Sequence, residues 1–123
     1  MRLQHQPNKL TCGQTAVAIA AGIPVRKAIA IFGHDHDTRT YEVKIALKKL
    51  GLKCDTRRRR VSKLRSLPSF CLIFLRSNLV RWGHWAVHYE GKILDPWYGR
   101  IDAKKMNYPY KDIYISSYLE IYN

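Results

Sequence analysis

Apolar and polar positions in the first half of the chain follow the pattern of short helices. Cys12 to Ala21 (CGQTAVAIAA) is rich in alanine, a strong helix former, and Gly22 is a residue type that commonly ends a helix. Pro24 favours the opening of a second helix, which is predicted over roughly Val25 to Phe32 and closed by Gly33. Two helices are therefore predicted before the polar stretch GHDHDTR.

A third helix is predicted from about Tyr41 to Leu50. Thr40 is the expected N-cap, because its hydroxyl can accept a hydrogen bond from the first turn. Glu42 in that turn complements the positive end of the helix dipole. One face of this helix carries the apolar residues Val43, Ala46, Leu47 and Leu50.

The second half changes to the pattern of strands. Phe70 to Leu75 (FCLIFL) is a continuous apolar run of strand length, as expected for a buried central strand. His84 to Tyr89 and Lys92 to Leu94 flank Glu90-Gly91, which is typical of a tight hairpin turn. Ile113 to Tyr122 is rich in β-branched and aromatic residues and is predicted to form a last strand. Helices followed by antiparallel strands predict an α+β domain.

Length and composition limit the class of protein. The 123 residues, 46% of them hydrophobic, are expected to form a single globular domain over residues 1–123. No apolar run approaches the ~20 residues that cross a bilayer, and the chain does not open with a signal-peptide pattern, so a cytoplasmic, intracellular protein is expected. Three cysteines at irregular spacing favour free thiols over a disulfide framework.

The charge balance points to polyanions. Twenty-two Lys and Arg face nine Asp and Glu, for a formal net charge of +13. The densest cationic run is Arg57, Arg58, Arg59 and Arg60. This run is a candidate surface for nucleic acid or an acidic protein partner. The alternative interpretation, a solvated connector between the third helix and the first long strand, is equally open.

Cys12 is the candidate nucleophile. It stands where a helix is predicted to begin, and there the helix dipole and unpaired backbone N–H groups stabilise a thiolate. The same N–H groups can stabilise an oxyanion. Gly13, the small residue that follows, would let a substrate approach the sulfur closely. The alternative interpretation is that Cys12 is a small buried apolar residue at the start of an alanine-rich helix.

The predicted hairpin supplies partners for a thiol nucleophile, which needs a base and an acceptor that orients the base. With Glu90-Gly91 as a two-residue turn, Tyr89 pairs with Lys92 and Ala86 lies opposite Asp95. His84 is then a diagonal neighbour of Asp95 on the same face, within side-chain reach. His88 is diagonal to Asp95 from the other side, so the pattern leaves two candidate histidines.

Three stretches in order resemble the signatures of the bacteriocin leader-processing cysteine peptidases, which cleave after a double glycine and have a papain-like fold. They are QPNKLTCG from Gln6 to Gly13, GHWAV from Gly83 to Val87, and ILDP from Ile93 to Pro96. The resemblance implies a papain-like α+β fold with Cys12 as nucleophile, His84 rather than His88 as base, and Asp95 as its orienting acid. It also implies that Gln6, six residues before the cysteine, helps to form the oxyanion hole.

The function expected from these residues is thiol-dependent hydrolysis of a peptide or isopeptide bond, with no cofactor. Gly13, Trp82 and Gly83 are expected to line the substrate groove. The competing hypothesis is an inactive peptidase-like module that binds nucleic acid or an acidic protein through its basic surface. A metal site at the stretch His34, Asp35, His36 and Asp37 is not predicted, because adjacent residues of a short loop seldom all reach one ion.

Overall fold

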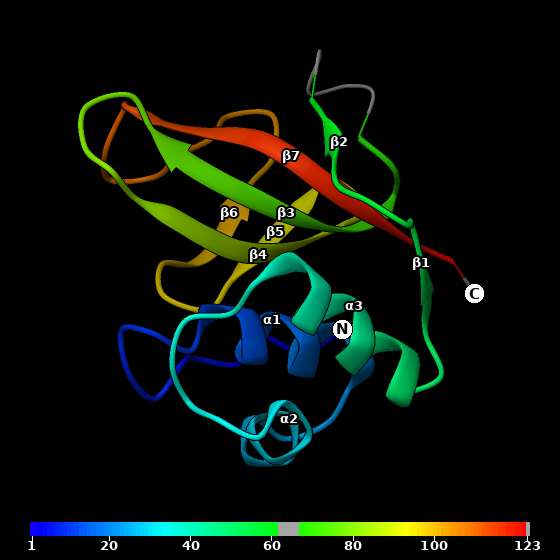
Figure 1. Ribbon diagram of the computed structural model, residues 1–123. Helices are drawn as coiled ribbons and strands as arrows, with labels where there is room; N and C mark the ends of the chain where they lie inside the picture. Colours follow the sequence, from blue (N-terminus) through cyan, green and yellow to red (C-terminus); the bar gives the residue numbers. More distant parts are fainter. Residues whose placement is uncertain (62–66, 123) are drawn as a thin grey trace.

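Three helices lie on one side of an antiparallel sheet in the computed structural model, which describes residues 1–61 and 67–122 (Figure 1). The helices are α1 (Cys12–Ala21), α2 (Val25–Phe32) and α3 (Thr40–Lys49). Helix α1 ends at Gly22, whose left-handed backbone (φ 71°) suits glycine, and its N–H bonds back to the carbonyls of the last turn.

The sheet follows the order β1-β7-β3-β4-β5-β6, and β2 pairs with β7 outside that path. Every described pairing is antiparallel. The strands are β1 (Lys53–Cys54), β2 (Arg59–Arg60), β3 (Phe70–Ser77), β4 (Gly83–Tyr89), β5 (Lys92–Asp95), β6 (Gly99–Asp102) and β7 (Ile113–Tyr122). The C-terminal strand β7 is therefore the partner of three others, two of them the short strands β1 and β2.

Apolar side chains fill both faces of the sheet. On one face, Val17 and Ile19 of α1 pack with Leu72 and Trp85. On the other face, a second cluster includes Ile73 of β3 together with residues of β4 to β7. Burial on both faces explains the unbroken apolar run of β3, since neither side of that strand meets water along most of its length.

The predicted α+β order is confirmed, and α1 and α2 have the predicted bounds. The prediction of Thr40 as the N-cap of the third helix was wrong, because Thr40 is the first helical residue and Arg39 is the N-cap. The physical reason is Glu42: its Oε1 accepts the backbone N–H of Arg39 at 2.9 Å, which moves the start of the helix back by one residue.

The predicted hairpin register is also confirmed, with Tyr89 opposite Lys92 and Val87 opposite Leu94. Three short strands, β1, β2 and β6, were not predicted. Two of them are two residues long and lack alternation that a sequence could reveal, and they exist because β7 offers them a backbone edge.

The three helices differ from a membrane-spanning helix in length and composition. Among the described residues, none is by itself both long and apolar enough to cross a bilayer. Only α1 and α2 taken together reach that length and composition, and the chain bends by 118° between them.

Candidate active site

Cys12 is the first residue of α1, as the sequence predicts. The N-cap residue Thr11 makes no side-chain capping bond, and its hydroxyl instead donates to the Asn8 carbonyl at 3.2 Å. The first turn also contains no acidic residue. The partly exposed Cys12 thiol therefore lies at the positive end of the α1 dipole. Neither a capping side chain nor an acidic residue offsets the partial positive charge there.

His84 and Asp95 meet across the hairpin formed by β4 and β5. Because Val87 lies opposite Leu94, the next positions along the two strands place Asp95 opposite Ala86, and His84 is its diagonal neighbour. His84 Nε2 lies 2.7 Å from Asp95 Oδ1, and the two side chains are almost fully buried. A carboxylate only accepts, so Nε2–H is the donor and Nδ1 is left for another partner.

Asp95 is held by four hydrogen bonds. Its Oδ1 also accepts the backbone N–H groups of Trp97 at 2.8 Å and Tyr98 at 2.9 Å, and its Oδ2 accepts the Tyr108 hydroxyl at 2.6 Å. Burial by itself would raise the pKa of Asp95, but the bonds from His84, Tyr108 and Tyr98 outweigh it and lower that pKa. Asp95 is therefore a fixed anion at neutral pH.

The His84 imidazole is placed between Asp95 and Cys12. Burial alone would lower its pKa, but hydrogen bonds and negative charge from Asp95 and Cys12 raise the pKa from 6.5 to about 9. The protonated ring is thus stabilised from both sides. The ring is therefore placed to exchange a proton with the Cys12 thiol.

The second candidate histidine has different partners. His88 Nδ1 lies 2.9 Å from the Pro68 carbonyl and 3.9 Å from the buried Cys71 sulfur. Burial lowers the pKa of His88, and the Pro68 carbonyl opposes this only in part. The hairpin alone left both histidines open, and their surroundings now distinguish them: of the two, His84 bonds to Asp95 and His88 does not among the described contacts.

Gln6 lies at the same site. Its backbone N–H donates to the Pro96 carbonyl at 3.0 Å, which brings the N-terminal segment beside the residue after Asp95. Its amide Nε2 donates to the Asn8 carbonyl at 2.8 Å, and Oε1 has no partner among the described residues. An amide nitrogen carries a second N–H, so Gln6 retains a donor beyond the Asn8 bond.

A hollow of about 290 Å³ opens beside the imidazole. It is lined by Gln6, Lys9, Trp82, His84, Trp97 and Tyr98. The Trp82 ring stacks on His84, with centroids 5.2 Å apart and planes inclined by 18°. Trp85 instead faces the buried cluster under α1, as strand alternation requires.

Gly13 and Gly83 are small for packing reasons. A Cβ on Gly13 would lie 2.1 Å from Thr38 Oγ1, and a Cβ on Gly83 would lie 2.5 Å from the ring of Phe74. Neither position tolerates a side chain without movement of its neighbour. Contact of either glycine with a substrate stays a prediction.

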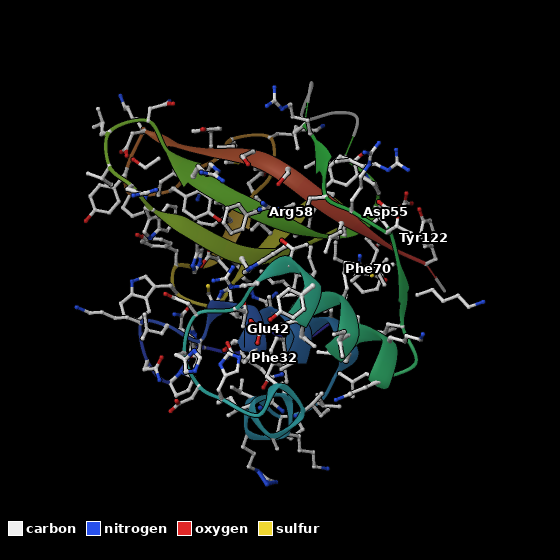
Figure 2. The ribbon with its side chains drawn as sticks, in the orientation of Figure 1. Phe32, Glu42, Asp55, Arg58, Phe70 and Tyr122 are labelled. Atoms are coloured by element: carbon white, nitrogen blue, oxygen red, sulfur yellow. The ribbon has the colours of Figure 1, made fainter. Side chains whose placement is uncertain are left out.

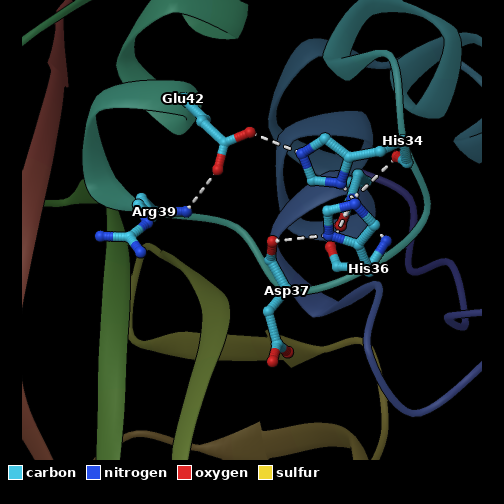
Figure 3. Close-up of polar contacts among 6 residues, drawn as sticks. His34, His36, Asp37, Arg39 and Glu42 are labelled. Atoms are coloured by element: carbon cyan, nitrogen blue, oxygen red, sulfur yellow. Dashed lines mark hydrogen bonds and ion pairs between the residues drawn. The ribbon is translucent and has the colours of Figure 1, made fainter.

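The loop of residues 33–39 contacts α1 through hydrogen bonds from Gln14. Gln14 Nε2 donates to the carbonyls of His34 at 3.1 Å and His36 at 2.9 Å, and the His34 ring bonds to Glu42 (Figure 3). The same loop brings Thr38 against Gly13. No group of three metal-ligating side chains is placed for an ion in residues 1–61 and 67–122.

Three residues that bond to Asp95, namely Tyr108, Trp97 and Tyr98, are absent from the sequence-based prediction of the site. One signal was available: an aspartate two residues before a free N–H is typical of an Asx turn, so Asp95-Pro96-Trp97 could have predicted the backbone bonds. Tyr108 gave none, because only the tertiary fold brings it to Asp95.

The arginine run does not form one continuous patch. Arg59 Nε lies 3.5 Å from Asp55 Oδ2, whereas the Arg58 guanidinium lies 4.4 Å from the centroid of the Phe74 ring. Figure 2 labels Asp55 and Arg58. Arg57 is exposed, and Arg58 and Arg60 line one hollow that Arg57 and Arg59 do not. Whether these residues bind a polyanion stays a prediction at this point.

Solved structures show which fold this is. The peptidase domain of Streptococcus mutans ComA superposes with a TM-score of 0.64 over 100% of both chains, at 16% identity. The chain has the fold of the ComA peptidase domain. A second structure, the peptidase domain of Streptococcus ComA, described as a bifunctional ABC transporter involved in a quorum-sensing pathway, gives a TM-score of 0.59 at 13% identity, over 98% of this chain and 96% of that one.

The fold of the ComA peptidase domain confirms the predicted papain-like α+β class and the structural resemblance to double-glycine peptidases. No protein-family model matches the sequence, and no curated protein matches it at a significant level. At these identities the likeness establishes the fold, and the chemistry has to be argued from the site itself.

Proposed function

We propose that this protein is a cysteine peptidase that cleaves a peptide bond by acyl transfer. The observation that carries the proposal is the position of His84, which bonds to Asp95 through Nε2 and also interacts with Cys12, the first residue of α1. A nucleophile, a base and an orienting acid in that order are the parts of a catalytic triad. The peptidase domains that share the fold support the same class.

Each residue has a defined role. His84 holds the proton taken from Cys12, and the thiolate attacks the substrate carbonyl carbon. The resulting oxyanion accepts hydrogen bonds from the Cys12 backbone N–H and from the Gln6 amide. The C–N bond breaks as His84 protonates the leaving amine, and an acyl thioester remains on Cys12. His84 then deprotonates a water molecule, whose oxygen attacks the thioester carbonyl carbon. The C–S bond breaks, the acid is released, and the proton held by His84 returns to the Cys12 sulfur.

The first experiment measures the thiol and the hydrolysis separately. Iodoacetamide should label Cys12 much faster than Cys54, whose pKa is raised by partial burial. Fluorogenic peptides that contain Gly-Gly are the first substrates to test, and an isopeptide is the second. Cys12→Ala should abolish hydrolysis, whereas Cys54→Ala, the matched thiol control, should leave it intact.

The alternative of an inactive binding module predicts a different result. Cys12 would then be labelled no faster than Cys54, and no peptide or isopeptide would be cleaved at any pH between 6 and 9. That pair of outcomes would reject the proposal, because a thiolate held by His84 cannot be unreactive toward a small alkylating agent.

A further inference from the structure

A second polar hollow, of about 740 Å³, is separate from the candidate active site. Its polar lining consists of Arg58, Arg60, Arg76, Tyr114, Ser116 and Ser117. No carboxylate belongs to the lining among the residues that the structure describes. Three arginines and several hydroxyl groups therefore surround one space. One of them, Arg76, lies sixteen residues after Arg60 and does not belong to the Arg57–Arg60 run.

Strand geometry selects the arginines that reach this hollow. Successive side chains of an extended chain point to opposite sides, so Arg58 and Arg60 share one side and Arg59 takes the other, where it pairs with Asp55. Arg60 lies opposite Ser117 of β7, and Arg76 of β3 lies opposite Tyr114. Three strands thus converge on the hollow.

A bulge in β7 shapes the floor. Between Phe74 and Leu75 the register with β7 shifts by one residue, because Phe74 lies opposite Ser117 and Leu75 opposite Ile115. Ser116 is therefore an extra residue, and its hydroxyl lies 3.5 Å from that of Ser117. A bulge re-aims side chains locally, and here two hydroxyl groups line the space beside the arginines.

The charges of the hollow are not neutralised within the described chain. Arg58, Arg60 and Arg76 make no ion pair with any residue of 1–61 or 67–122. The guanidinium groups of Arg58 and Arg76 lie 4.4 and 5.4 Å from the centroid of the same Phe74 ring. Like charges held this close repel, and partial burial of Arg58 adds to the cost of that charge.

We propose that this hollow is a binding site for a phosphate group. Guanidinium forks match phosphate oxygens with two parallel hydrogen bonds, and serine hydroxyls supply further donors. A phosphate group presents more acceptor oxygens than a carboxylate does, and its charge offsets the repulsion between Arg58 and Arg76. The phosphate belongs either to a nucleic-acid backbone or to a free phosphate ester. This site is independent of the peptidase chemistry.

The test uses a fluorescein-labelled oligothymidylate and measures anisotropy at several salt concentrations, with unlabelled pyrophosphate as competitor. Arg58→Lys with Arg76→Lys keeps the net charge but removes the forks, and should weaken binding by about tenfold or more. Arg26→Gln with Arg100→Gln removes two exposed charges elsewhere and should weaken binding only slightly. Arg60→Gln, which removes an exposed side chain, provides a variant that does not disturb the Phe74 contacts.

The competitor distinguishes the source of the phosphate. Displacement by pyrophosphate shows that the hollow takes an isolated phosphate group, whereas binding that depends on the forks but resists pyrophosphate shows that it takes a nucleic-acid strand. An Arg58→Lys and Arg76→Lys variant that binds as tightly as the parent, while the Arg26→Gln and Arg100→Gln control loses affinity, would overturn the proposal, because net charge alone would then explain binding. Tighter binding of an acidic peptide than of the oligonucleotide would also overturn it. Cys12 labelling in the same variants reports on the peptidase site separately.

Discussion

His84 Nε2 lies 2.7 Å from Asp95 Oδ1, and this contact leaves Nδ1 as the ring nitrogen available to another partner. Asp95 has no exposed surface, and its carboxylate is saturated by donors from three other residues. Because these hydrogen bonds fix the orientation of the Asp95 carboxylate, the carboxylate in turn fixes the orientation of the His84 ring.

Replacement of the two strand histidines should separate the base from its neighbour. His84→Ala should lower the hydrolysis rate by at least ~100-fold and slow the labelling of Cys12, because the thiol loses its base. His88→Ala should keep both rates within a few-fold, since His88 bonds to Pro68 and Cys71 instead. Thermal unfolding of each variant checks that the fold is intact, and the reverse ranking of the rates would contradict the assignment.

Tyr108→Phe should affect catalysis through Asp95. The change removes a buried donor to Oδ2, and the expected loss in the free energy of unfolding is about 1–3 kcal/mol. Because Tyr108 is a positioning residue, kcat should fall while KM changes little. Tyr110→Phe removes the hydroxyl of an exposed tyrosine and serves as the control. Unchanged kcat and pH profile in Tyr108→Phe would limit that residue to a structural role.

The titration of His84 should extend to high pH. Its pKa is raised to about 9 from 6.5, so the stabilisation of the folded state is complete below pH 6.5 and is lost as the pH rises through 9. The loss amounts to at most about 3 kcal/mol in the free energy of unfolding. NMR of the ring protons measures the pKa directly.

Variants of the two partners test the cause of that titration. Cys12→Ala and Asp95→Asn each remove one source of the raised pKa, so the pKa of His84 should fall in both. Asp95→Asn should cost less activity than His84→Ala, because an orienting group contributes less than the base itself. A ring that titrates near 6.5 in the parent protein would show that neither partner holds the imidazolium.

Gly13→Ala should destabilise the start of α1. The new methyl group would meet Thr38 Oγ1 at 2.1 Å, and overpacking of this kind costs about 1–3 kcal/mol. Thr38→Ala removes the obstructing hydroxyl, which has no partner among the described residues, and should be nearly neutral alone. The double variant should recover most of the lost stability in urea unfolding. Simple addition of the two single effects would mean that the clash is not the cause.

Local rules of sequence determined α1, α2, the hairpin of β4 and β5, and the position of Cys12 at the start of α1. Alanine content with Gly22 and Gly33 set the bounds of α1 and α2, and Glu90-Gly91 set the register that places His84 diagonal to Asp95. These features depend on residues close together in the chain, where propensity and turn chemistry act directly. Glu42 shows the limit of this reasoning. Its carboxylate accepts the backbone N–H of Arg39, so α3 begins one residue earlier than predicted.

The tertiary structure alone decided which long-range partners each site residue received. Tyr108 reaches Asp95 from thirteen residues away, His88 is occupied by the Pro68 carbonyl, and Thr38 fills the space above Gly13. The pairing of β2 with β7 likewise decides the surroundings of the arginine run, because it places Arg60 opposite Ser117. Contacts of this kind depend on how the sheet and the helices pack. The sequence shows which residue types are present, but it does not show which of them come within contact distance.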